Sequence, residues 1–151
     1  MTEADFAFLR QLLLQRSGLS LTADKQYLAE SRLGILCRRR GISDIPTLVT
    51  QLRLGRDRLL ENAVVDAMTT NETLFFRDRT PFDQFRNDIL PTLAERGGPV
   101  RICSLGCSTG QEPYSMAMTL LSVFPDAAAL DIKILASDID TDVLATGRLA
   151  L

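Results

Sequence analysis

The chain has 151 residues, of which 46% are hydrophobic and 24% are charged, and its formal net charge is −2. This length and composition are typical of a soluble globular protein with one average domain or two small ones. A net charge so close to zero gives no indication of nucleic-acid binding, and we expect no nucleic-acid partner.

The residue types that the chain lacks limit its chemistry. It has no histidine, so a Ser-His-Asp or Cys-His catalytic unit cannot be built from this chain alone. Its three cysteines, Cys37, Cys103 and Cys107, are an odd number without framework spacing, which predicts no zinc site and a reduced, cytoplasmic setting. No apolar run approaches the ~18–20 residues that span a membrane, and the N-terminus lacks the pattern of a signal peptide.

The charges are distributed unevenly along the chain. Residues 22–60 contain eight basic and four acidic side chains, a balance of +4, whereas residues from 69 onward contain seven basic and eleven acidic ones, a balance of −4. This asymmetry predicts that the two parts meet different partners.

Four short helices are predicted in the first part of the chain. They are expected over residues 3–16, about 22–40, from Ser43 or Asp44 onward, and over about 56–68. Thr22 is a candidate N-cap and Gly41 a stop signal. The side chains expected inside, from their helical spacing, are Phe6, Leu9, Leu13, Leu28, Ile35, Leu36, Leu48, Leu52, Leu59, Leu60, Ala63 and Val64. The pattern predicts a small all-α bundle over residues 1–68.

Residues 69–98 form a linker segment and one further helix. The stretch TTNETLFFRD is polar, then aromatic, then charged, and it offers the amide of Asn71, the hydroxyl of Thr73 and the guanidinium of Arg77. A capped, solvated linker fits the same residues. A helix is then expected over residues 81–95, ending at two glycines and a proline. The side chains expected on its inner face are Phe82, Phe85 and Ile89.

Residues 99–151 change to a strand-helix-strand-helix pattern. Strands are expected over residues 100–105 and 132–136, and helices over 113–123 and from about 141 onward. This order predicts a parallel sheet with a right-handed crossover, as at the start of an α/β Rossmann-like domain. Two parallel strands are too few for such a sheet, so we expect this domain to be truncated and the chain to be the front part of a longer protein.

The turn between the first strand and its helix contains Gly106 and Gly110. Such a turn is typical of nucleotide-type sites, in which backbone N–H groups and the helix N-terminus face the ligand. Asp138 follows the second strand, at the same edge of the sheet, where its carboxylate can accept hydrogen bonds from a ribose. Glu112, at the entry of the helix, can pair with a ligand cation. Turn formation, capping and a favourable helix dipole explain the same residues without a ligand.

The turn also matches the G-x-S-x-G pattern of hydrolases, with Ser108 as the nucleophile. A hydrolase is therefore a rival hypothesis, but its base would have to come from outside this chain.

Three blocks of the sequence together resemble one family. TTNETLFFRD, RICSLGCSTGQEPYSMA and ILASDIDTDVLATGR occur in the order and at the spacing of the CheR chemotaxis receptor methyltransferases. The preceding helices, with their basic stretch, resemble the N-terminal domain of that family. The resemblance covers essentially the whole chain, and one departure is Gln111, where relatives commonly have a second glutamate.

The resemblance implies methylation of glutamate side chains on chemotaxis receptors, with S-adenosylmethionine (SAM) as methyl donor and S-adenosylhomocysteine as product. It implies an α-helical N-terminal bundle followed by the start of a SAM-dependent methyltransferase domain over residues 99–151. The cofactor-binding residues would be Asn71, Thr73, Arg77, Gly106, Glu112 and Asp138. Among them, Glu112 would hold the ammonium group and Asp138 the ribose.

The remaining roles fall on arginines. Arg77 is the candidate catalytic residue, because a guanidinium can also hold the incoming carboxylate. Arg38, Arg39 and Arg40 are expected to dock on the cytoplasmic helices of chemoreceptors, although a solvated face explains them too. An alternative function is a non-catalytic fragment that binds a receptor or another partner and lacks a complete SAM site.

Overall fold

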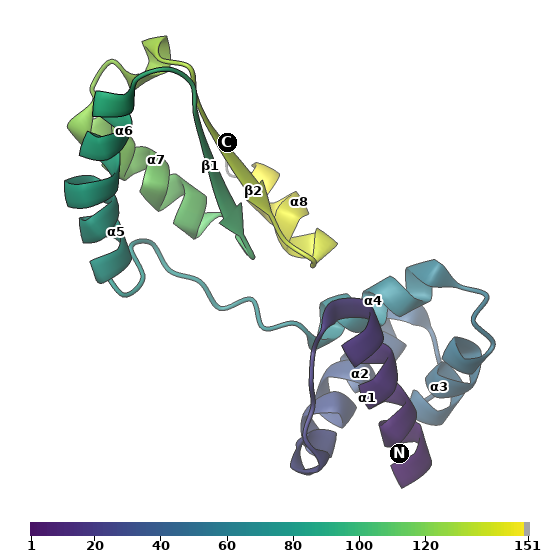
Figure 1. Ribbon diagram of the computed structural model, residues 1–151. Coiled ribbons are helices and arrows are strands. Elements are labelled where there is room, and N and C mark those ends of the chain that lie inside the picture. The colour runs from purple at the N-terminus through teal and green to yellow at the C-terminus, as the bar shows by residue number, and fades with distance from the viewer. Residues whose placement is uncertain (150–151) are drawn as a thin grey trace. The chain divides into compact units, whose positions relative to one another are not determined.

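The computed structural model describes residues 1–149, which form two compact units: the first ends at Thr70 and the second begins at Asn71 (Figure 1). The first unit is all helical, and the second combines helices with a small sheet. None of the described helices combines the length and the apolar character that crossing a membrane requires.

The first unit is the predicted helical bundle. It contains α1 (Glu3–Ser17), a 3-10 turn (Ala23–Lys25), α2 (Gln26–Arg40), α3 (Ile45–Arg53) and α4 (Arg58–Met68). Both α1 and α2 end at a glycine in the left-handed region, Gly18 with φ 73° and Gly41 with φ 67°. Glycine adopts this conformation without the steric cost that a Cβ atom brings.

Side-chain caps set where the later helices of this unit begin. The carboxylate of Asp44 accepts the N–H of Thr47 at 2.8 Å at the start of α3, and Asp57 accepts the N–H of Leu60 at 2.9 Å at the start of α4. Each cap satisfies one of the backbone donors left free in a first helical turn. The prediction that Thr22 caps the second helix is wrong, because Thr22 precedes the 3-10 turn and makes no side-chain cap bond.

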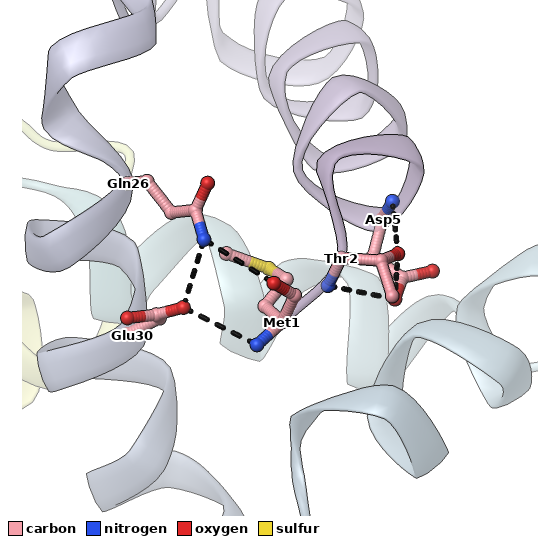
Figure 2. A network of polar contacts seen from close by, with 5 residues as sticks. All are labelled: Met1, Thr2, Asp5, Gln26 and Glu30. Carbon is pink, nitrogen blue, oxygen red and sulfur yellow. Dashed lines mark hydrogen bonds and ion pairs between the residues drawn. The ribbon is translucent and has the colours of Figure 1, made fainter.

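The chain start is attached to α2 by a polar network (Figure 2). The Met1 ammonium lies 3.3 Å from Oε1 of Glu30, and the amide of Gln26 donates both to Glu30 (3.0 Å) and to the Met1 carbonyl (3.3 Å). Beside it, Thr2 and Asp5 form a reciprocal capping box at the start of α1. Together these contacts fix where α1 begins.

The core of the first unit contains most of the predicted side chains. It consists of Phe6, Leu9, Leu13, Leu21, Ala29, Leu33, Leu36, Cys37, Leu48, Val49, Leu52, Leu60, Val64, Val65 and Met68. Two predictions are wrong, since Ile35 is 44% and Leu59 is 72% exposed. In α2 the inward stripe passes through Ala29 and Leu33, which places Ile35 on the solvent side of the helix.

The second unit has the predicted alternation of helices and strands. Its elements are α5 (Thr80–Gln84), a π-helical turn (Phe85–Ile89), α6 (Leu90–Arg96), β1 (Val100–Leu105), α7 (Gln111–Val123), a 3-10 turn (Ala127–Ala129), β2 (Ile132–Ser137) and α8 (Thr141–Leu149). The two strands pair in parallel, from Val100 with Ile132 to Leu105 with Ser137, as predicted. Leu120 of α7 packs with Ile102 and Ile132, so α7 covers one face of this sheet.

The helix predicted over residues 81–95 is interrupted by the π-helical turn. Phe82 and Phe85 are buried as expected, but Ile89 is 48% exposed and Leu90 is buried in its place. The N–H of Leu90 donates to the carbonyl of Phe85, one residue farther back than in an α-helix, and this shifts the next inward position by one. Pro91 follows directly, and a proline disrupts the hydrogen bonds of the preceding helical turn.

The orientation of α2 predicts which of its side chains contribute to the stability of the first unit. Leu33 is 0% exposed, so Leu33→Ala is expected to lower the free energy of unfolding by about 2–5 kcal/mol through lost burial and a residual cavity. Ile35→Ala, two residues away on the exposed side, is the matched control and is expected to change it by about 0.5 kcal/mol or less. Urea unfolding followed by circular dichroism measures both, and equal losses would contradict the observed orientation of α2.

Candidate functional site

The loop between β1 and α7 is shaped by residues in the left-handed region. Gly106 has φ 77°, Ser108 φ 50° and Gly110 φ 101°. A Cβ atom on Gly110 would lie 2.9 Å from the ring of Tyr114. Glycine is therefore required at position 110 by both the backbone conformation and the space available.

Backbone donors of this loop bind the end of β2. The N–H groups of Gly106 and Cys107 donate to the carbonyl of Ser137 at 2.8 and 2.9 Å, and the N–H of Ser108 donates to Oδ2 of Asp138 at 2.8 Å. The expectation that the N–H groups of this loop face a ligand is therefore wrong for these three residues. They join the loop to the acidic segment instead, which brings Gly106 and Asp138 to the same edge of the sheet.

Asp138 is half-buried and accepts hydrogen bonds on both carboxylate oxygens. Besides the bond from Ser108, its Oδ1 accepts the N–H of Asp140 at 2.9 Å. A carboxylate offers about four acceptor sites. Asp138 therefore keeps the capacity to accept further hydrogen bonds, such as those of a diol, while its orientation is fixed from two sides.

Asn71 connects the linker segment to the same cluster. Its carbonyl accepts the hydroxyl of Ser108 at 2.7 Å, and its side-chain amide donates to Oδ2 of Asp140 at 2.6 Å. With the bonds from Ser108 to Asp138 and from Asp140 to Asp138, the contacts close a ring of four residues. We call Asn71, Ser108, Asp138 and Asp140 the polar ring.

The polar ring joins three segments that lie far apart in the sequence: the linker after α4, the loop after β1 and the acidic stretch after β2. It also anchors α8, because Oδ1 of Asp140 accepts the N–H groups of Asp142 and Val143 at 2.9 and 3.3 Å. Ser108 is 6% and Asp140 4% exposed. Their polar atoms are therefore satisfied inside the protein, as burial requires.

Glu112 lies in the first turn of α7, and its side chain is oriented by a residue of β1. The hydroxyl of Ser104, which is 1% exposed, donates to Oε1 of Glu112 at 2.7 Å. The carboxylate itself belongs to an exposed residue. This geometry leaves Glu112 an oriented negative charge beside the loop, as the binding of a ligand cation requires.

The other two predicted linker residues, Thr73 and Arg77, are not part of the polar ring. Within residues 1–149, the one side-chain hydrogen bond of Arg77 goes from Nη1 to the carbonyl of Glu72, at 2.8 Å. Thr73 is half-buried. The linker makes a further contact with α7, where the N–H of Phe76 donates to the hydroxyl oxygen of Ser115 at 2.9 Å.

Ser108, the candidate nucleophile, and the neighbouring thiol of Cys107 are both poorly placed for attack. Ser108 is buried and its hydroxyl donates to the carbonyl of Asn71, so the geometry does not favour the hydrolase hypothesis. Cys107 is 3% exposed, and burial raises the pKa of its thiol, as do the negative charges of Asp138 and Glu112. A thiol with a raised pKa remains protonated and unreactive near neutral pH.

Sequence reasoning missed four residues that shape this site. Ser104, Ser115 and Asp140 were not singled out, and Ser108 was considered only as a nucleophile. Asp140 had a recognisable signal, since an aspartate just before a predicted helix is a typical N-cap. The serines had none for these roles, because the partners that matter here, Glu112, Asn71 and Phe76, are not adjacent to them in the sequence.

Comparison with known proteins assigns both units to one family. Residues 4–69 match the family model "CheR methyltransferase, all-alpha domain", and residues 71–151 match "CheR methyltransferase, SAM binding domain". The chain is 43% identical over 136 residues to chemotaxis protein methyltransferase 1 of Vibrio cholerae. These matched residues make up 89% of this chain and 50% of that protein.

Other relatives agree. Chemotaxis protein methyltransferase 1 of Pseudomonas aeruginosa is 46% identical over 119 residues, or 78% of this chain and 43% of that protein. The chemotaxis protein methyltransferase of Vibrio parahaemolyticus is 38% identical over 146 residues, or 95% of this chain and 53% of that protein. The chain spans about half the length of the curated relatives it matches. With its all-α domain followed by the matched part of a SAM-binding domain, the chain belongs to the CheR methyltransferase family.

Proposed function

We propose that this chain carries the docking part and the first cofactor-binding part of an enzyme that methylates glutamate side chains of chemotaxis receptors in the cytoplasm. The family supports a methyltransferase with SAM as donor. The observation that carries the proposal is the polar ring, because it joins the linker, the loop and the acidic segment into one cluster.

Within this proposal, each part of the chain has its own task. Residues 1–68 dock on the receptor, residues 69–98 contribute the linker to the cofactor site, and residues 99–151 supply the loop and the acidic segment. Asn71, Thr73, Arg77 and Gly106 line the cofactor site.

Two carboxylates give the site its fit for SAM, which carries positive charge on its ammonium and sulfonium groups. Glu112, oriented by Ser104, pairs with the ammonium group, and Asp138, with acceptor capacity left on its carboxylate, accepts the ribose hydroxyls. When bound, SAM supplies an activated methyl group, so the cofactor carries the difficult part of the chemistry.

The reaction needs little acid–base chemistry from the protein. The substrate glutamate has a reference pKa of ~4.3, so it is already ionised near neutral pH and needs no general base. A chain without histidine is suited to such a transfer. The protein has to align the carboxylate oxygen with the methyl carbon, and alignment of this kind contributes ~7–11 kcal/mol in well-oriented reactions.

Binding of SAM tests the proposal directly. We would titrate SAM and S-adenosylhomocysteine calorimetrically into this chain and into a chimera that continues it with the C-terminal half of the Vibrio cholerae relative. Glu112→Gln and Asp138→Asn in the chimera are each expected to weaken binding about 10-fold or more, since bonds to a charged group contribute about 1.5–3 kcal/mol. Glu95→Gln, an exposed residue of α6, is the control and should bind as the unchanged chimera does.

The outcomes separate the two candidate functions. Binding to the unchanged chimera that both site variants weaken supports the enzyme. A folded chimera that binds receptor but neither compound would contradict the enzyme and support the alternative, a non-catalytic partner-binding fragment.

The catalytic role of Arg77 is tested by Arg77→Lys in the chimera. Lysine keeps the positive charge but loses the planar, forked donors that can hold a carboxylate. We expect kcat for receptor methylation to fall about 10-fold or more, the loss that ~1.4 kcal/mol of transition-state stabilisation produces. Arg79→Lys, two residues further along, is the control, and unchanged turnover of Arg77→Lys would refute the role.

Docking through the basic end of α2 is tested by receptor binding at different salt concentrations. Arg38, Arg39 and Arg40 form the last turn of α2 and are exposed. The double variant Arg39→Ala/Arg40→Ala is expected to bind acidic receptor helices several-fold more weakly and with less dependence on salt, because exposed charge contacts are screened. Arg56→Ala/Arg58→Ala removes the same charge elsewhere in the unit. Equal effects of the two pairs would contradict a specific docking role.

A further inference from the structure

The linker before α5 has an unusual backbone. Phe76, Asp78 and Arg79 have φ values of 52°, 63° and 44°, so three residues with side chains have a positive φ within four positions. Such conformations are costly for residues with a Cβ atom and persist only where the surrounding structure holds them. This stretch therefore needs specific contacts to keep its shape.

Ser115 of α7 supplies a buried contact of this kind. Its hydroxyl oxygen accepts the N–H of Phe76 at 2.9 Å and its hydroxyl hydrogen goes to the carbonyl of Gln111, at 2.6 Å. The residue is 0% exposed. The Phe76 ring also packs edge-on against the buried ring of Phe82, with 5.4 Å between the centroids.

The two bonds of Ser115 differ in what they support. The bond to Gln111 lies within one turn of α7, where the backbone already provides the helical hydrogen bonds. The bond from Phe76 spans 39 positions in the sequence and attaches the linker to the helix that follows the loop. Loss of the hydroxyl would therefore leave α7 in place and remove the hydrogen bond that attaches the linker backbone at Phe76.

We propose that Ser115 is a positioning residue of the cofactor site, which holds the linker at Phe76 and thereby keeps the adjacent Thr73 and Arg77 in place. The inference rests on the proposed function, since it gives Ser115 a part in the binding of SAM. The polar ring fixes the linker at Asn71, and Ser115 fixes it at Phe76. The candidate site residues Thr73 and Arg77 lie between these two anchors or directly beside one of them.

The test compares Ser115→Ala with Thr119→Val. Thr119 lies one turn further along α7 and is also buried, and its hydroxyl donates to the carbonyl of Ser115 at 2.8 Å, a bond within the helix. The first variant removes the anchor of the linker, and the second removes a helix-internal hydroxyl of the same kind. Ser115→Cys, with a weaker acceptor of similar size, is expected to give intermediate results.

Two readouts are needed. In the 151-residue chain, hydrogen exchange at the Phe76 amide is expected to become about 10-fold faster or more in Ser115→Ala and to stay unchanged in Thr119→Val. In the chimera, Ser115→Ala is expected to raise the Kd for SAM about 10-fold. The melting temperature of this variant is expected to be close to that of the Thr119→Val chimera.

The two readouts test the anchor at Phe76 and its part in cofactor binding separately. Unchanged exchange at Phe76 in Ser115→Ala would overturn the anchor, and faster exchange with an unchanged Kd would overturn its part in cofactor binding. Failure of the unchanged chimera to bind SAM would instead refute the proposed function, and with it the link from Ser115 to the cofactor.

Discussion

The structure of the second unit depends on the polar ring formed by Asn71, Ser108, Asp138 and Asp140. The negative charges of Asp138 and Asp140 would repel each other, and each of these carboxylates accepts hydrogen bonds from other members of the ring. The N–H of Asp140 and the N–H of Ser108 both point at Asp138, and the amide of Asn71 points at Asp140. Because Ser108 and Asp140 are almost fully buried, each of these bonds is costly to lose.

Parallel pairing of β1 and β2 makes this ring possible. The carboxyl ends of parallel strands lie at the same edge of a sheet, so the loop after β1 and the acidic segment after β2 meet there. Three N–H groups of the loop, those of Gly106, Cys107 and Ser108, donate to Ser137 and Asp138. The carboxylates of Asp138 and Glu112 add negative charge at this edge, which suits a positively charged ligand better than a phosphate.

Three buried serines form the scaffold around the candidate site residues. Ser104 orients the carboxylate of Glu112, Ser108 holds the carbonyl of Asn71, and Ser115 holds the N–H of Phe76. A serine hydroxyl both donates and accepts one bond in a small volume, so it fits between closely packed elements. The residues proposed to touch the cofactor are thus supported by others whose own polar groups are used within the protein.

Local sequence patterns were sufficient for the elements and for their order. Cap residues such as Asp44, the punctuating glycine Gly41 and the apolar run of β1 act on their immediate neighbours, so their effects can be predicted from the chain itself. The two-part organisation and the parallel sheet followed from the same patterns. The orientation of helices did not: Ile35, Leu59 and Ile89 were expected inside and are exposed, because burial depends on which neighbour a helix packs against and, at Ile89, on a π-helical turn.

Only the tertiary structure decided which polar groups meet. Asn71 bonds Asp140 across 69 positions and Ser108 across 37, and Phe76 bonds Ser115 across 39. No periodicity encodes such pairs, since they arise where separate elements are brought together by packing. The sequence by itself therefore determined the elements and the candidate charges of the site. The fold alone determined that three loop N–H groups bind Ser137 and Asp138 and that serines hold the linker.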